Sequence, residues 1–155
     1  MAVIAAAAPV SVQCLSARFV ENGAGTYTAD FTLPPNAVLL DIIVSAEAVW
    51  TAATSASMDI GNAADPNGYF AGINLKATDL LAGESVSIAG GTDTAGGEAG
   101  ADATAGTNTH IMDRWYSATA PYVITATVAS VGAGTAGRTR VDVLYAVGNP
   151  AEVTI

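Results

Sequence analysis

Short stretches in which apolar and polar residues alternate recur along this chain, and turns rich in Gly, Pro, Asn and Asp separate them. The clearest alternation lies in residues 38–50, VLLDIIVSAEAVW. One face would carry Leu40, Ile42, Val44, Ala46, Ala48 and Trp50. Asp41, Ser45 and Glu47 would lie on the other face, and a helix would fit these polar positions almost as well. The β-branched residues and the preceding Pro-Pro-Asn turn favour a strand.

The same alternation predicts strands elsewhere in the chain. They cover residues 26–33, 55–60, 69–73, 85–88, 122–131 and 138–147. One helical turn is expected within residues 74–81, and a hairpin-type connection over residues 132–137. About seven or eight short strands, with a turn every eight to twelve residues or so, predict an all-β, single-domain β-sandwich of Ig-like or jelly-roll type.

Two segments lack a strand pattern of useful length. Residues 1–24 are Ala-rich and alternate only briefly, so we expect an N-terminal arm with one edge strand. Residues 89–107 contain only Gly, Ala, Thr and three acids, which predicts a long Gly/Ala-rich loop. The expected organisation is therefore an arm over residues 1–24 and a jelly-roll β-sandwich over residues 25–155. We expect the arm and the loop to contact partners.

The charge and the hydropathy of the chain disfavour two classes of partner. Fourteen acidic residues against five basic ones give a formal net charge of -9, and a surface of that sign repels nucleic acid. No apolar run reaches the ~18 residues that a membrane-spanning helix needs. Only 12% of the residues are charged, about half the usual share, so the chain either hides much of its surface against partners or exposes many small neutral groups.

The residues that catalysis or metal binding would need are scarce. One histidine, His110, and one cysteine, Cys14, leave no triad, no zinc site and no redox pair. Asp41 and Glu47 are six residues apart on the same predicted strand face, about 20 Å by the strand rise, which is too far for the carboxylate pair of a glycosidase. No enzymatic activity, metal or cofactor is expected. Calcium ligation remains an alternative for the acids of residues 59–67 and of the 89–107 loop, but neither group has EF-hand spacing.

Arginine and aromatic side chains are the candidates for contacts with other subunits. Arg138 and Arg140 face away from the predicted core, where they could pair with acids of an adjacent copy. The aromatic side chains that could form a sugar-stacking platform are Tyr69, Phe70, Trp115, Tyr116 and Tyr122. Packing in the core or in an interface is the preferred interpretation of these aromatics. Of them, Tyr69, Trp115 and Tyr116 are expected to contact another subunit.

Four segments together resemble a known family. They are the strand of residues 38–50, MDIG at 58–61, AADPNGYF at 63–70 and the terminal RVDVLYAV at 140–147. In this order the segments look like the small jelly-roll structural proteins of tailed bacteriophages, particularly the head decoration (cement) proteins. The resemblance covers residues 26–147, and the long loop of residues 89–107 departs from the compact version of the pattern.

The resemblance implies a structural virion protein that is made in the host cytoplasm and binds the exterior of the phage head. Its partners would be the major capsid protein, whose joints it would stabilise, and itself, as a homotrimer on three-fold axes. No catalytic residue or cofactor comes with the resemblance. The alternative is a phage tail or fibre component that binds carbohydrate or a receptor through Tyr69, Phe70 and Trp115. A small cupin-like enzyme would need several converging metal ligands, which one histidine does not supply.

Overall fold

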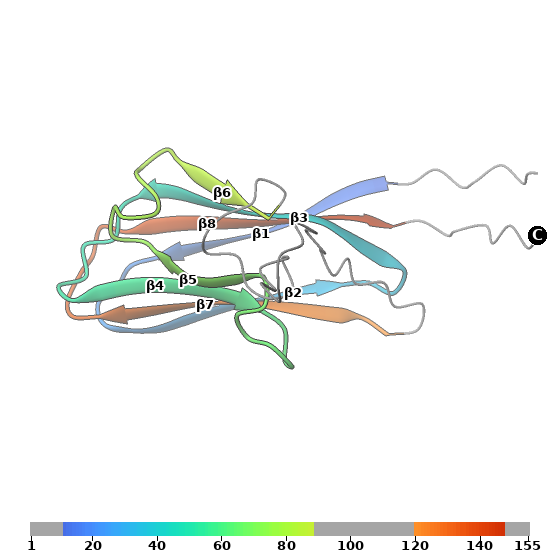
Figure 1. Ribbon diagram of the computed structural model, residues 1–155, viewed down its shortest axis with the longest axis horizontal. Helices are drawn as coiled ribbons and strands as arrows, with labels where there is room; N and C mark the ends of the chain where they lie inside the picture. Colours follow the sequence, from blue (N-terminus) through green and yellow to red (C-terminus); the bar gives the residue numbers. More distant parts are fainter. Residues whose placement is uncertain (1–10, 89–119, 148–155) are drawn as a thin grey trace, which may run out of the picture.

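A computed structural model of the chain describes residues 11–88 and 120–147, which form two antiparallel four-stranded sheets stacked face to face (Figure 1). Sheet A runs in the order β1 (Ser11–Val20), β8 (Arg138–Val147), β3 (Ala37–Ala48) and β6 (Ser85–Ser87). Sheet B runs in the order β2 (Gly25–Leu33), β7 (Tyr122–Val131), β4 (Ser55–Gly61) and β5 (Phe70–Asn74). The predicted all-β sandwich is confirmed.

The chain passes between the two layers at almost every connection. Among consecutive strands, only β4 and β5 are neighbours in one sheet, whereas each other pair is divided between sheets A and B. Such an order makes most strand pairing non-local, as in the two Greek keys of an eight-stranded jelly roll. The observed strand order agrees with the jelly-roll arrangement expected from the sequence.

The core lies between the sheets and is built from the inward-facing residue of each alternating pair. Its largest members, all nearly inaccessible to solvent, are Trp50, Tyr69, Phe70, Leu33, Ile42, Met58, Ile60, Ile73, Leu75, Leu80, Ile124 and Val44. Trp50 was predicted to face the core and does so, with 2% of its surface exposed. Its ring meets Tyr27 edge-on at 5.5 Å, and its Nε1 donates a hydrogen bond to Thr139.

Two irregularities in β3 correct the predicted core-facing row. The register of β3 against β8 shifts between Leu39 and Asp41, and again between Ala46 and Ala48. A bulge of this kind inserts an extra residue and reverses which residues face inward. Leu39 is therefore buried where Leu40 was expected, and Leu40 and Ala48 are only half-buried.

Two predicted connections also differ from the structure. Residues 132–137 are not a hairpin, because β7 lies in sheet B and β8 in sheet A, so this segment joins the two layers. Residues 75–78 form consecutive turns rather than a helical segment. The 132–137 segment is held by a distant part of the chain, because Glu21 N donates to Gly137 O and Gly23 N donates to Gly134 O.

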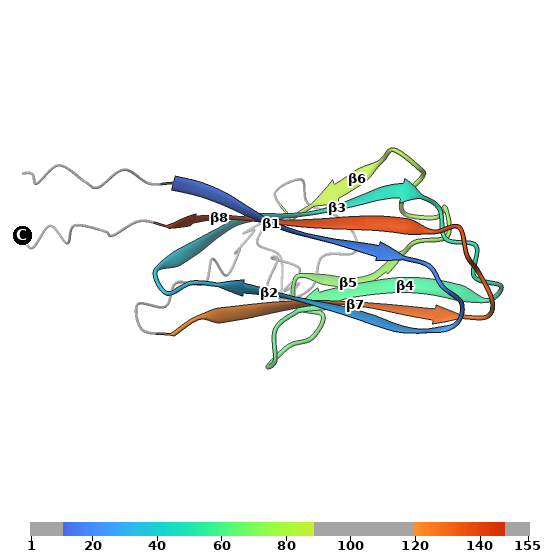
Figure 2. The ribbon, with the colours of Figure 1, turned by 180° about the vertical axis from the view of Figure 1, so that it is seen from behind.

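The segment expected as an arm contains a full strand. From Ser11 to Val20 it is β1, which pairs with β8 along its whole length and forms one edge of sheet A. Residues 1–10 and the loop of residues 89–107 lie outside the described residues. Figure 2 shows β1 and β2 as the long edge strands on one side of the sandwich. The edge strands of the opposite side, β5 and β6, are shorter.

Glu21 joins three connections at one end of the sandwich. Its side chain is 2% exposed, and its Oε2 accepts hydrogen bonds from Thr51 N at 3.0 Å, Thr51 Oγ1 at 2.9 Å, Ala136 N at 3.1 Å and Gly137 N at 2.9 Å. The carboxylate thus links the β1–β2, β3–β4 and β7–β8 connections. Its Oε1 lies against Gly134, where a Cβ would collide with it.

Burial raises the pKa of Glu21, because a charge is less stable away from water. Hydrogen bonds from Thr51, Gly137 and Ala136 favour the charged form and outweigh burial, so that the pKa lies below its ordinary value. The hydrogen-bond donors at this end of the sandwich therefore stabilise the ionised form of the Glu21 carboxylate.

Candidate functional site

The side chains of sheet A that point away from the core form its outer face. Because side chains alternate along a strand, the register brings outward residues of β1, β8 and β3 into common rows. Val12, Ala146 and Val38 form a row near one end, and Arg18 and Arg140 form a row with Ser45 near the other. The face therefore divides into an apolar part and a basic part.

The apolar part is unusual for a face that points away from the core. We call it the apolar patch and define it as Val12, Val38, Ile43, Leu144 and Ala146. Val12 is 64% exposed, and the other four are half-buried. A sheet with one solvated face normally shows polar residues there, so apolar residues in several rows make this patch a candidate contact surface.

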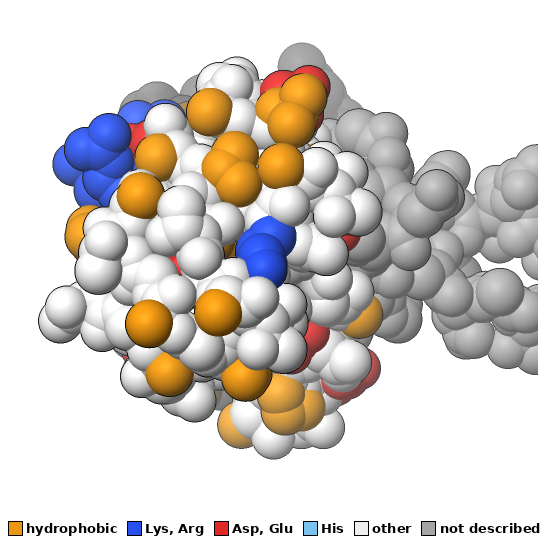
Figure 3. All heavy atoms as spheres, turned by 90° about the vertical axis from the view of Figure 1, so that its left-hand side faces the viewer, with side chains coloured by type: hydrophobic (Ala, Val, Ile, Leu, Met, Phe, Trp, Pro, Cys, Tyr) orange, Lys and Arg blue, Asp and Glu red, His pale blue; other side chains and the backbone are white. Residues whose placement is uncertain are grey.

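The basic part consists of Arg18, Arg138 and Arg140, called here the arginine row. Arg18 donates to Glu47 at 2.7 Å, and Arg140 donates to Asp142 at 2.8 Å. Asp142 is 7% exposed and also accepts a hydrogen bond from Ser16. Within residues 11–88 and 120–147, Arg138 makes no ion pair. Figure 3 shows basic side chains gathered at one corner of the sandwich end, with another basic group nearer the middle.

The outer face of sheet B has a different character. Its β2 residues are Thr26, Thr28, Asp30 and Thr32, all exposed, and β4 contributes Ser55, Ser57 and Asp59. No Lys or Arg belongs to the four strands of this sheet. Strand β7 adds Val123, which is 41% exposed, and Val131, which is 51% exposed. The outer face of sheet B is therefore mainly polar with separate exposed valines, and the arginine row is specific to sheet A.

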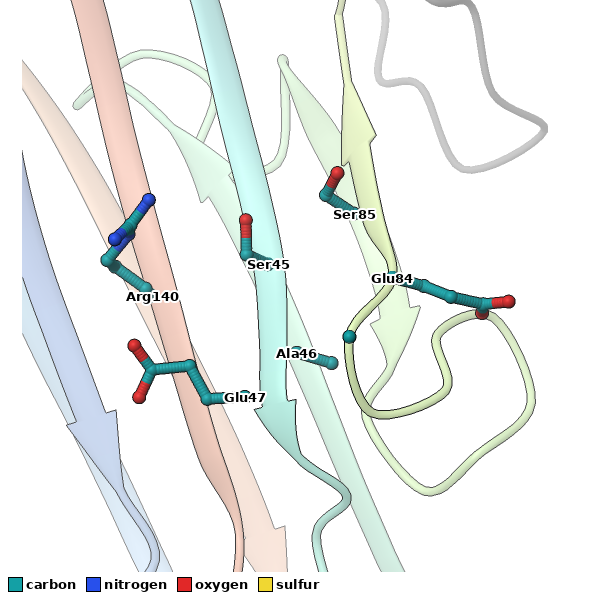
Figure 4. Close-up of a pocket in the computed structure, with 7 residues that line it drawn as sticks. Ser45, Ala46, Glu47, Glu84, Ser85 and Arg140 are labelled. Carbon is teal, nitrogen blue, oxygen red and sulfur yellow. The ribbon is translucent and has the colours of Figure 1, made fainter.

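A shallow hollow of about 250 Å³ lies beside the arginine row, with Ser45 between Arg140 and the β5–β6 connection (Figure 4). Arg140 borders it on the β8 side, and Glu84 and Ser85 border it on the β6 side. Figure 4 shows the Glu84 side chain pointing away from Arg140. The hollow can receive a side chain of another protein beside a guanidinium group.

The predicted contact residues fall into three groups. Arg138 and Arg140 are exposed on sheet A, as expected for an interface. Tyr69 is 2% exposed and Phe70 is fully buried, so neither ring is available for a sugar or for another subunit. Their burial follows from their place beside β4, where Tyr69 N donates to Ile60 O at 2.9 Å. Trp115 and Tyr116 lie outside the described residues, as does His110.

Arg18 is a basic residue of this face that the sequence did not single out as a candidate. It lies about 120 residues before Arg140 in the chain, yet the register of β1 on β8 sets the two directly opposite each other. The alternation of exposed and more buried positions in residues 16–20 places Arg18 and Val20 outward, and this pattern could have identified Arg18. Only the strand pairing shows that this face continues into Arg138 and Arg140.

The described residues hold no group of three or more His, Cys, Asp or Glu side chains that could bind a metal ion. None of the elements in residues 11–88 and 120–147 is a helix long and apolar enough to cross a membrane. The chemistry that the outer face of sheet A does offer is apolar contact and charge-assisted hydrogen bonding from arginine.

Comparison with known proteins gives matches only at the level of structure. No protein-family model and no curated protein sequence matches the chain. A chain in the acidic stable capsid structure of Helicobacter pylori bacteriophage KHP30 matches with a TM-score of 0.54 and 18% identity, covering 88% of this chain and 87% of that one.

Two further matches are with phage capsids. A chain of the cyanophage Pam1 capsid asymmetric unit gives a TM-score of 0.49 at 19% identity, over 93% of this chain and 94% of that one. A chain of the capsid of Ralstonia phage GP4 gives 0.49 at 18% identity, over 97% and 92%. At these identities the KHP30 match establishes a shared fold. Because the shares covered are nearly equal, the KHP30 chain is about as long as this one.

Proposed function

We propose that this chain is a structural virion protein of a tailed bacteriophage. In this role it is a decoration (cement) protein that binds the outside of the head and stabilises joints between major capsid proteins. The observation that carries the proposal is the outer face of sheet A, where an apolar patch lies beside three of the chain's five basic residues. A protein with a net charge of -9 that concentrates arginine beside apolar side chains on one face is suited to assembly with other subunits, either further copies of the same chain or capsid proteins.

The fold supports this proposal. A chain of about the same length and the same fold is part of the KHP30 capsid structure, and the sequence resemblance to head decoration proteins is independent of that match. The proposal includes assembly as a homotrimer on the capsid exterior, with no catalytic activity. The alternative of a carbohydrate-binding tail or fibre component is not favoured, because Tyr69 and Phe70 of its expected platform are buried.

The purified protein should form a trimer of 15.4 kDa chains and sediment with assembled phage heads. Light scattering on a size-exclusion column measures the mass, and sedimentation of heads with and without the protein measures binding. Heads saturated with decoration protein already on their surface serve as the control, since they offer no vacant sites. Protein that stays in the supernatant with undecorated heads would contradict the proposal.

A further inference from the structure

The outer face of sheet A needs a partner surface with two properties. It must cover the apolar patch, and it must supply carboxylates to the arginine row. The carboxylates nearest the row do not complete it, because Glu47 and Asp142 already bind Arg18 and Arg140. The one further acid on the strands of this face is Asp41, which is half-buried and lies in register with Leu144 of the apolar patch, away from Arg138. The face fits an acidic surface of another kind.

The same chain carries two acids on its β5–β6 connection, residues 75–84. The one basic residue there, Lys76, donates from Nζ to Ala53 O and Thr54 O. Leu81 is 53% exposed there, and Asp79 and Glu84, both exposed, are close to it in sequence. Hydrogen bonds hold both carboxylates in place: Asp79 Oδ2 accepts from Asn74 N at 2.6 Å, and Glu84 Oε2 accepts from Leu81 N at 2.7 Å. An apolar side chain between two fixed carboxylates complements an apolar patch beside arginines. Each carboxylate can accept further donors.

We propose that the outer face of sheet A binds the β5–β6 connection of a second copy of this chain. Copies would then join head to tail, because the two surfaces in contact are different. The β5–β6 connection runs from sheet B to sheet A on the side of the shorter edge strands (Figure 1). The patch and the arginine row instead lie on the outer face of sheet A. Contacts between two surfaces that point in different directions rotate each successive copy. They close a ring where that rotation fits, as the proposed homotrimer requires, and otherwise extend into an open filament. The inference deepens the proposed function by naming the surfaces through which the homotrimer assembles.

Charge reversal at Arg138 tests the arginine half of this contact. Arg138 is exposed and makes no ion pair with the described residues, so Arg138→Glu should leave the fold intact. The concentration at which the oligomer dissociates, followed by light scattering, should rise at least about tenfold. The control is Thr26→Glu/Thr28→Glu on the outer face of sheet B, which changes the net charge by the same amount and should leave the mass unchanged.

Charge exchange tests the acidic half. The double variant Arg138→Glu/Glu84→Arg should recover most of the lost association, because each copy again offers opposite charges across the contact. Melting temperatures of all variants show whether each remains folded. An unchanged mass for Arg138→Glu, an unrecovered double variant that is folded, or a monomeric unmodified protein would each overturn the proposal.

Cys14 gives a second measurement that does not depend on charge. It is exposed and is paired in register with Leu144 of the apolar patch. Maleimide should react slowly with Cys14 in the oligomer and quickly in Arg138→Glu. A thiol at Thr28→Cys in a Cys14→Ser background should react at one rate in both. If Cys14 becomes protected only when phage heads are added, the face belongs to a capsid partner. That result would overturn this inference and leave the proposed function standing.

Discussion

Replacing Glu21 by alanine is expected to lower the free energy of unfolding by roughly 3–4 kcal/mol, since the backbone donors of Thr51, Ala136 and Gly137 would all lose a charged acceptor. The three connections that meet at this carboxylate each join sheet A to sheet B. The substitution should therefore lower the stability of the whole sandwich. Denaturant unfolding at neutral pH measures the change.

The matched control is Glu47→Ala. Glu47 is likewise a hydrogen-bonded carboxylate, but it lies on the surface in an ion pair with Arg18, whose side chain is 57% exposed. We expect it to cost less than about 1 kcal/mol. Equal losses for Glu21→Ala and Glu47→Ala would show that the hydrogen-bond cluster contributes no more than a surface pair, and would contradict this account of the sandwich end.

The stabilisation from Glu21 should also depend on pH. Its pKa in the folded protein lies below the ordinary value of 4.5, so the unfolded chain binds the proton more readily than the folded chain does. The contribution is therefore fully present above pH 4.5 and is lost as the pH falls from there through the folded-state pKa. Unfolding midpoints of the unmodified protein and of Glu21→Gln, measured from pH 7 to pH 3, should converge on the acid side. A constant difference would exclude this linkage.

Replacing Trp50 by alanine is expected to cost about 3–5 kcal/mol, the range for removing a large aromatic side chain from a core. The ring is 2% exposed, contacts Tyr27 edge-on, and donates from Nε1 to Thr139 Oγ1 at 2.9 Å. Thr139 is fully buried, so its hydroxyl would also lose its partner. Gly137 lies against the ring, where a Cβ would collide with the indole.

Trp50→Phe separates the two contributions. It keeps much of the apolar volume and removes the indole N–H, so we expect a smaller loss than for alanine, again read from denaturant unfolding. A loss below about 1 kcal/mol for Trp50→Ala would contradict the assignment of this side chain to the centre of the core.

The strands could be predicted from the sequence because alternation is a local property of the chain. Residues 26–33 and 122–131, for example, became β2 and β7 with nearly the expected bounds. The pairing of strands could not be predicted in the same way. The residues of the 132–137 connection have the composition of a hairpin turn, and only the contacts of Ala136 and Gly137 with Glu21 show why the chain crosses to the other sheet.

Only part of the candidate site could be predicted, again because the pairing of strands leaves no local pattern in the sequence. The outward alternation of β8 identified Arg138 and Arg140, but the third arginine and most of the apolar patch depend on the register of β1 and β3 with β8. Glu21 could not be identified from the sequence, because a single acid next to Asn and Gly is typical of a turn. Its partners lie 30 to 116 residues further along the chain, a distance at which the sequence carries no local signal. The bulges of β3, which decide between Leu39 and Leu40, also follow from pairing.

The most direct measurement of the central claim is a cryo-electron microscopy difference map between phage heads assembled with this chain and heads assembled without it. The proposed function predicts additional density on the outer surface of the head, at joints between major capsid proteins and around three-fold axes, into which three copies of the sandwich fit. Identical head maps, with the chain found only in the tail, would contradict the decoration role.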